Sequence, residues 1–120
     1  GENIYPEDIE AVSNSERHVL ESLVYELKGK LVAKVHLNYD EIDQRYNELK
    51  ESAGQMYEQT REKVSQRLKE IQEKVNARLN RFSKLTLIEE QSEPFEKTPT
   101  KKIKRFLYHH QNHSSNNKNS

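Results

Sequence analysis

The feature that most constrains the fold of this chain is a long helical stripe between positions 39 and 82. It opens with a capping-box pattern, Asn38 followed by Glu41, and then continues in steps of three or four residues. A continuous helix of this length would extend roughly 60 Å at ~1.5 Å per residue, which is more than a small domain needs. Because Gly54 is the weakest helix former, the sequence leaves open one unusually long amphipathic helix or a helical hairpin broken near Gly54. The stripe consists of Ile42, Tyr46, Leu49, Ala53, Met56, Thr60, Val64, Leu68, Ile71, Val75, Leu79 and Phe82.

The composition indicates one small, well-solvated domain. Of the 120 residues, 32% are hydrophobic and 33% are charged, so part of the chain must be highly solvated. The 20 basic and 20 acidic residues cancel, which argues against nucleic-acid or membrane binding driven by net charge. The lack of cysteine excludes disulfides and thiolate metal sites. With no signal peptide and no apolar run of about 18 residues, we expect a soluble, cytoplasmic protein.

A short helix is predicted before the stripe, over residues 5–13. Pro6 suits its first position, because the N–H that proline lacks would have no helical partner there. Ile4 and Ile9 have the spacing of a hydrophobic staple across the start of this helix.

A β-hairpin is predicted over residues 19–37, where apolar and polar residues alternate. A three-residue turn at 28–30 would place Leu27 opposite Leu31 and gather the apolar residues on one buried face. A two-residue turn would instead pair Glu26 with Leu31, so we expect the longer turn. The alternating residues are Leu23, Tyr25, Leu27, Leu31, Ala33, Val35 and Leu37.

The remaining pattern completes an α+β domain. Residues 84–90 read as a strand, and a basic segment at 101–108 follows a proline-containing loop. We expect a small antiparallel sheet, made of the hairpin and this strand and flanked by helices. Residues 1–108 would form the domain, and the Asn-, Ser- and His-rich residues 109–120 a disordered polar tail.

Two motifs, one at each end of the predicted domain, resemble those of a known enzyme family. Residues 93–105 read EPFEKTPTKKIKR, which resembles the C-terminal motif of AMP-forming acyl-CoA synthetases in its long-chain fatty acid–CoA ligase version. Residues 1–10 read GENIYPEDIE, which resembles the motif that opens the small C-terminal domain of the same enzymes. The resemblance implies a detached C-terminal lid domain, with most of the enzyme missing.

The C-terminal motif of this family carries a lysine that reaches the active site of the large N-terminal domain. Its common form is Thr-x-Ser-Gly-Lys, followed by isoleucine and a basic residue. The resemblance places Lys102 at the lysine and Lys101 at the glycine, which the long-chain subgroup often lacks; Lys101 or Lys104 remains an alternative for the lysine. The supporting positions of the motif are Thr98, Pro99, Thr100 and Arg105.

The resemblance also assigns a role to the first residues. In the family, a glycine-led loop approaches the CoA channel once the domain has rotated for thioester formation. Gly1 and Glu2 occupy that loop here, and a glycine without a side chain permits close approach of the backbone to a thin ligand.

The implied function is that of an acid–thiol ligase. The intact enzyme would use ATP, Mg and CoA, while the fragment alone would bind no cofactor, would be inactive and would be a monomer. Its partner would be the N-terminal adenylation domain of the same polypeptide, with no nucleic acid. Peripheral contact with the inner face of the membrane stays open for the intact enzyme.

Two other functions fit parts of the sequence. The stripe could pair with a partner helix through Leu49, Met56 and Val64 and make the chain a non-catalytic interaction module. Alternatively, residues 101–105, with nearby aromatic residues, could contact acidic phospholipid or RNA. We expect no metal site, because the histidines of the tail, His109, His110 and His113, lack accompanying carboxylates.

Overall fold

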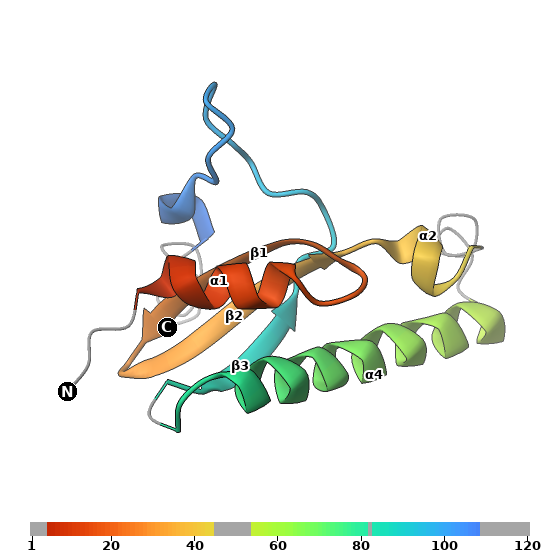
Figure 1. Ribbon diagram of the computed structural model, residues 1–120. Coiled ribbons are helices and arrows are strands. Elements are labelled where there is room, and N and C mark those ends of the chain that lie inside the picture. Colours follow the sequence, from red (N-terminus) through yellow and green to blue (C-terminus); the bar gives the residue numbers. More distant parts are fainter. Residues whose placement is uncertain (1–4, 45–53, 82, 109–120) are drawn as a thin grey trace, which may run out of the picture.

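The computed structural model describes residues 5–44, 54–81 and 83–108, which form a three-stranded sheet covered by helices. Figure 1 shows α1 and α4 packed along the sheet, and the segment after β3 rising away from it. The α+β class is therefore confirmed. In chain order the elements are α1 (Pro6–Asn14), β1 (Val19–Leu27), β2 (Lys30–Leu37), α2 (Tyr39–Ile42), α4 (Gln55–Arg78) and β3 (Leu85–Glu90).

The predicted first helix is confirmed as α1. Tyr5 is its N-cap residue and Pro6 follows at the start of the helix, as the sequence predicted. Ile9 is buried in the core. The other half of the expected staple, Ile4, lies outside the described residues.

The hairpin β1–β2 is confirmed, but its expected register is wrong. Leu27 pairs with Lys30 and Glu26 with Leu31, so the turn has two residues, Lys28 and Gly29. Both have positive φ, 53° and 78°, as the tight turns that suit the twist of a hairpin require. The preference for a longer turn rested on the assumption of one buried face, and the sheet does not have that property.

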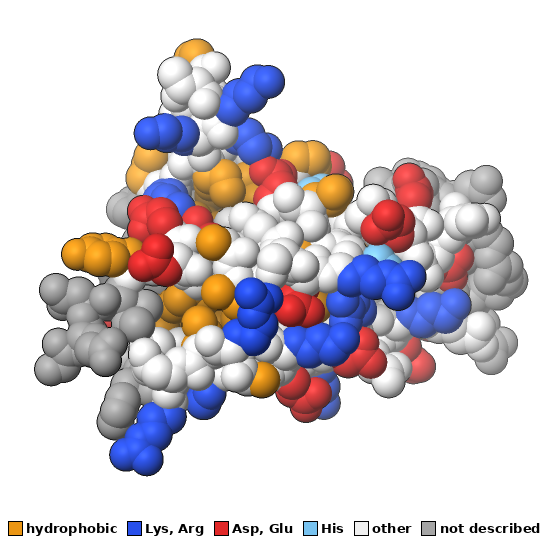
Figure 2. Space-filling model, in the orientation of Figure 1, with side chains coloured by type: hydrophobic (Ala, Val, Ile, Leu, Met, Phe, Trp, Pro, Cys, Tyr) orange, Lys and Arg blue, Asp and Glu red, His pale blue; other side chains and the backbone are white. Residues whose placement is uncertain are grey.

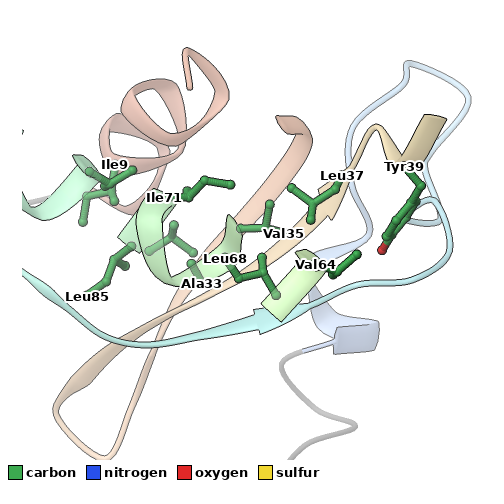
Figure 3. Close-up of a cluster of buried hydrophobic side chains, with 11 residues drawn as sticks. Ile9, Ala33, Val35, Leu37, Tyr39, Val64, Leu68, Ile71 and Leu85 are labelled. Atoms are coloured by element: carbon green, nitrogen blue, oxygen red, sulfur yellow. The ribbon is translucent and has the colours of Figure 1, made fainter. Parts of the chain in front are cut away.

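Both faces of the sheet bury side chains, because residues 95–108 cover the face opposite α1 and α4. One cluster joins the sheet to the two helices and is drawn in Figure 3. A second, smaller cluster contains Leu23, Tyr25 and Val32 of the sheet together with Phe95 and Tyr108. Consecutive residues of β1 can therefore all be buried, which removes the alternation that a one-sided sheet would show. The first cluster contains Ile9, Val24, Ala33, Val35, Leu37, Tyr39, Val64, Leu68, Ile71, Val75 and Leu85.

The expected antiparallel direction of the third strand is also wrong. β3 pairs with β2 in the parallel direction, from Leu31↔Leu85 to Val35↔Glu90. The chain between these two strands contains α4, which packs on the sheet as a crossover helix does. The sheet is therefore mixed, with the order β1-β2-β3.

The long stripe does not form one continuous helix. α2 ends at Ile42, and Asp43 is extended, with φ −153° and ψ 112°. Gly54 is the N-cap of α4, so of the two alternatives that the sequence left open, the structure supports a break near this glycine. Residues 45–53 lie outside the described part of the chain, as does the predicted tail at 109–120.

Within α4 the stripe faces the sheet. Its buried members include Val64, Ile71 and Val75, which are at most 1% exposed. Val64 is therefore unavailable to a partner helix, which removes one of the three contacts that the interaction-module hypothesis needs. In the described part of the chain, no helix is long and apolar enough to cross a membrane.

Candidate functional site

Residues 96–104, which contain most of the C-terminal motif, form a small β-hairpin. Lys97 and Ile103 form an antiparallel bridge, and the Lys104 amide donates to the Glu96 carbonyl at 2.9 Å. Closer to the tip, the Thr98 amide donates to the Lys102 carbonyl at 2.8 Å. The backbone of the motif is thus ordered by its own hydrogen bonds.

A three-residue loop, Pro99-Thr100-Lys101, closes this hairpin. The Lys101 amide donates to the Thr98 carbonyl at 2.8 Å, and proline favours the second position of such a turn. Lys101 has φ 69°, a left-handed conformation that follows the turn in many three-residue hairpins and that glycine usually supplies. Lys101 therefore has a backbone conformation that favours glycine, and it is the residue that the resemblance aligns with the glycine of the common motif.

Lys102 follows the left-handed residue on the returning arm of the hairpin. Its amide donates to the Thr98 hydroxyl at 3.1 Å, and that hydroxyl lies 3.0 Å from the hydroxyl of Thr100. The Lys102 side chain is exposed. The loop therefore fixes the backbone of Lys102 and leaves its ammonium group in solvent.

Aromatic packing attaches the base of the hairpin to the sheet. Phe95 and Tyr108 are 3% and 8% exposed, and their rings meet edge to face with centroids 4.9 Å apart. The Tyr108 hydroxyl also accepts the Glu96 amide at 2.6 Å. Residues just before and just after the hairpin are thereby joined to each other and to the body of the domain.

Arg105, which directly follows the hairpin, anchors its returning arm through a bidentate ion pair with Glu10 of α1. Its two terminal nitrogens donate to the two carboxylate oxygens at 2.7 and 2.6 Å. Hydrogen bonding to Glu10 raises the pKa of Arg105, against the opposing effect of burial. Glu10 is 7% exposed and also accepts the Val24 amide at 2.7 Å, so one carboxylate links α1, β1 and the hairpin segment.

A second ion pair anchors the outgoing arm. The Lys97 ammonium lies 2.5 Å from a carboxylate oxygen of Glu21 on β1, and the other oxygen accepts the Phe95 amide at 3.4 Å. These side chains are more exposed than Glu10, at 34% for Lys97 and 19% for Glu21. This second link is consequently more open to screening by salt.

The structure brings five of the expected site residues together, but in two different environments. Thr98, Pro99, Thr100 and Lys102 lie at the projecting tip, while Arg105 is turned back onto α1. Figure 2 shows lysine and arginine side chains gathered on the projecting part of the molecule. Gly1, Glu2 and the tail histidines lie outside the described residues. Across the described ranges, no three His, Asp or Glu side chains form a possible metal site.

Sequence reasoning missed Glu10 and Glu21 as contacts of the motif. Glu10 closes the first motif, and no pattern in the sequence indicates a partner for its carboxylate. It meets Arg105 across 95 positions, which no local pattern reports. The opposite charges of these two carboxylates and of the basic C-terminal motif were the signal that the sequence offered for these contacts.

The fold of this chain recurs in solved structures of much longer proteins. A fatty acyl CoA synthetase of Mycobacterium tuberculosis matches 92% of this chain with 18% of its own, at 23% identity and a TM-score of 0.60. A benzoate CoA ligase from Burkholderia xenovorans matches 89% with 18% of its own, at 23% identity and a TM-score of 0.58. The adenylation domain of a carboxylate reductase from Mycobacterium chelonae matches 97% with 18% of its own, at 18% identity and a TM-score of 0.59.

These likenesses establish a shared fold, and the chain spans less than a fifth of the length of each of these proteins. No family model matches the chain. No curated protein matches its sequence.

Proposed function

We propose that this chain is the mobile C-terminal domain of an AMP-forming acyl-CoA synthetase of the long-chain type, and that Lys102 serves adenylation. Three independent features support the assignment: the two motifs, the fold shared with solved CoA ligases, and the projecting hairpin that carries Lys102. The observation that carries it is the left-handed backbone of Lys101. It fits the register in which Lys101 occupies the glycine position and Lys102 the lysine position.

The exposure of Lys102 determines what this residue can do. An ammonium group at the tip of a projecting hairpin can act only on a ligand that another surface holds. In the proposed enzyme, that surface belongs to the N-terminal adenylation domain, which would bind ATP with its Mg²⁺ and the fatty acid. The lid would deliver the cation when it docks.

The chemistry of the first half-reaction needs such a cation. A fatty-acid carboxylate attacks the α-phosphorus of ATP, forms acyl-AMP and releases pyrophosphate. Both reacting groups are anions, so a positive charge between them lowers their repulsion and stabilises charge on the phosphoryl oxygens. A lysine side chain supplies a compact charge on a flexible stem.

The second half-reaction would use a different face of the same domain. After rotation, Gly1 and Glu2 would approach the channel in which the CoA thiol attacks acyl-AMP, forming the thioester and releasing AMP. The long-chain assignment depends on the subgroup resemblance at Lys101.

The test separates the two half-reactions in the full-length enzyme. We expect Lys102→Ala to lower the rate of acyl-AMP formation by at least ~100-fold, the size of effect seen when one group that stabilises transition-state charge is removed. Thioester formation from preformed acyl-AMP should change little. Lys74→Ala, which removes an exposed lysine from α4, is the matched control and should leave both rates unchanged.

Two further variants test the register. Lys101→Ala and Lys104→Ala should affect adenylation far less than Lys102→Ala. Equal losses in both half-reactions for Lys102→Ala would remove this residue from its proposed role.

A further inference from the structure

We infer that Glu10, assisted by Glu21, is a positioning residue: it holds the hairpin so that Lys102 is presented in one place. The catalytic part of this inference rests on the proposed function. The structural part concerns only how the body of the domain holds the hairpin.

The hairpin needs such support because it has little core of its own. Ile103 is half-buried, and residues 99–102 at the tip are exposed. Phe95 and Tyr108 fix the two ends of the segment, but they lie below the bridge between Lys97 and Ile103. Each arm requires an additional contact to set the direction in which the tip projects.

Each arm has one, and both are carboxylates of the body. Lys97 on the outgoing arm pairs with Glu21, and Arg105, which directly follows the returning arm, pairs with Glu10. A hairpin held at one arm could pivot about that contact, whereas two contacts on opposite arms remove the pivot. The direction of the tip is therefore set by charges on α1 and β1.

Of the two ion pairs, the one made by Glu10 restrains the hairpin more strongly. Its pair with Arg105 is bidentate, which fixes orientation as well as distance. Its carboxylate also accepts the Val24 amide, and this hydrogen bond opposes any movement of the carboxylate along with Arg105. Glu21 meets a single ammonium group, which imposes no such geometry.

The test uses Glu10→Gln, with Glu7→Gln as the matched control. Glutamine keeps the size of the side chain and an oxygen that can accept the Val24 amide, so the fold should survive. Glu7 lies one turn earlier on α1 and is 66% exposed, and its carboxylate is 4.0 Å from the Arg105 guanidinium. Only the Glu10 variant removes the bidentate pair.

The first readout is independent of enzymatic activity. In Glu10→Gln we expect the amides of Thr98 and Lys104, which donate across the hairpin, to exchange with solvent about 10-fold faster, because the restraint on local opening is lost. Amides in the core of β1 should be unchanged. Glu7→Gln should match the wild type. Unchanged exchange in Glu10→Gln overturns the inference.

The second readout is acyl-AMP formation by the full-length enzyme. Displacement of a reacting group by about 1 Å can lower a rate on the order of 100-fold, so we expect Glu10→Gln to lower kcat by roughly 10- to 100-fold with little change in KM. Thioester formation from preformed acyl-AMP should be spared. Because Glu10 acts through Lys102, adding Glu10→Gln to Lys102→Ala should cause no further loss.

A merely structural role would give a different pattern. Equal losses in both half-reactions, or a further loss on top of Lys102→Ala, would overturn the positioning role. If Lys102→Ala leaves adenylation unchanged, the proposed function fails, and with it the catalytic part of the inference. The exchange measurement then still decides whether Glu10 holds the hairpin.

Discussion

Because Lys101 has a left-handed backbone, we expect glycine at this position to stabilise the hairpin and glycine at a neighbouring position to destabilise it. A left-handed conformation costs a residue with a side chain about 1–2 kcal/mol. Glycine avoids this cost but loses about 0.5–1 kcal/mol more in backbone entropy when it is ordered. We therefore expect Lys101→Gly to stabilise the closed hairpin by roughly 0.5–1 kcal/mol.

Hydrogen exchange at the Thr98 amide is the appropriate assay. This amide donates to the Lys102 carbonyl, so it exchanges only when the hairpin opens locally. The expected stabilisation corresponds to exchange that is roughly 2- to 5-fold slower in Lys101→Gly. Unfolding of the whole domain would miss the effect, because the hairpin can open while the core stays folded.

Two further substitutions define the expected order. In Lys101→Val the branched side chain disfavours the left-handed region further, so exchange at Thr98 should be faster than in the wild type. Thr100 does not have a positive φ, so glycine at this position relieves no strain. Thr100→Gly only increases the backbone entropy of the open hairpin, and exchange at the Thr98 amide should therefore also be faster. If Lys101→Gly accelerated exchange as Thr100→Gly does, the left-handed assignment would be wrong, and the register that makes Lys102 the functional lysine would lose its support.

Two other predictions concern the body of the domain. The Asn76 side chain accepts a hydrogen bond from the amide of buried Leu85 at 2.7 Å and donates one to its carbonyl at 3.1 Å. Asn76→Ala should therefore lower the free energy of unfolding, measured in urea, by about 1–2.5 kcal/mol. The exposed control Glu73→Ala should lower it by much less. Burial, and then the charge of Arg67, lower the pKa of His18 below its ordinary value of 6.5. The unfolded chain thus takes up the proton first as pH falls, so this contribution to stability is complete above about pH 6.5 and is lost as pH falls through the folded pKa. His18→Asn, which tolerates the positive φ at this position, should flatten the decrease in urea-derived stability from pH 7 to pH 5.

Features that depend on local periodicity could be predicted from the sequence. Pro6 marked the start of α1, and the spacing of Val64, Ile71 and Val75 marked the buried face of α4. Gly54 marked the break because glycine is a poor helix former wherever it occurs. In each case the residues that determine the structure are within a few turns of one another.

The errors arose where distant parts of the chain meet. The turn at Lys28 was misjudged because Phe95 and Tyr108, some seventy and eighty positions later, bury the second face of the sheet. The direction of β3 could have been inferred, since a connection that contains a helix usually joins parallel strands. The partner of Arg105 could not, because nothing near Glu10 in the sequence distinguishes it from the other acidic residues of α1.

The way in which the hairpin is held also limits how far it can be preorganised. Hydrogen bonds and two ion pairs fix the backbone on both sides of Lys102, but its side chain lies in solvent and retains its rotamers. The domain therefore determines where the side chain of Lys102 begins. In the proposed function, the anionic ligand of the adenylation domain would complete the placement of its ammonium group. Immobilising the Lys102 side chain on a ligand would cost side-chain entropy, and a mobile backbone would add to this cost. In the proposed function, the anchor at Glu10 would limit the motion of the backbone, and the flexible side chain of Lys102 would adapt to the ligand.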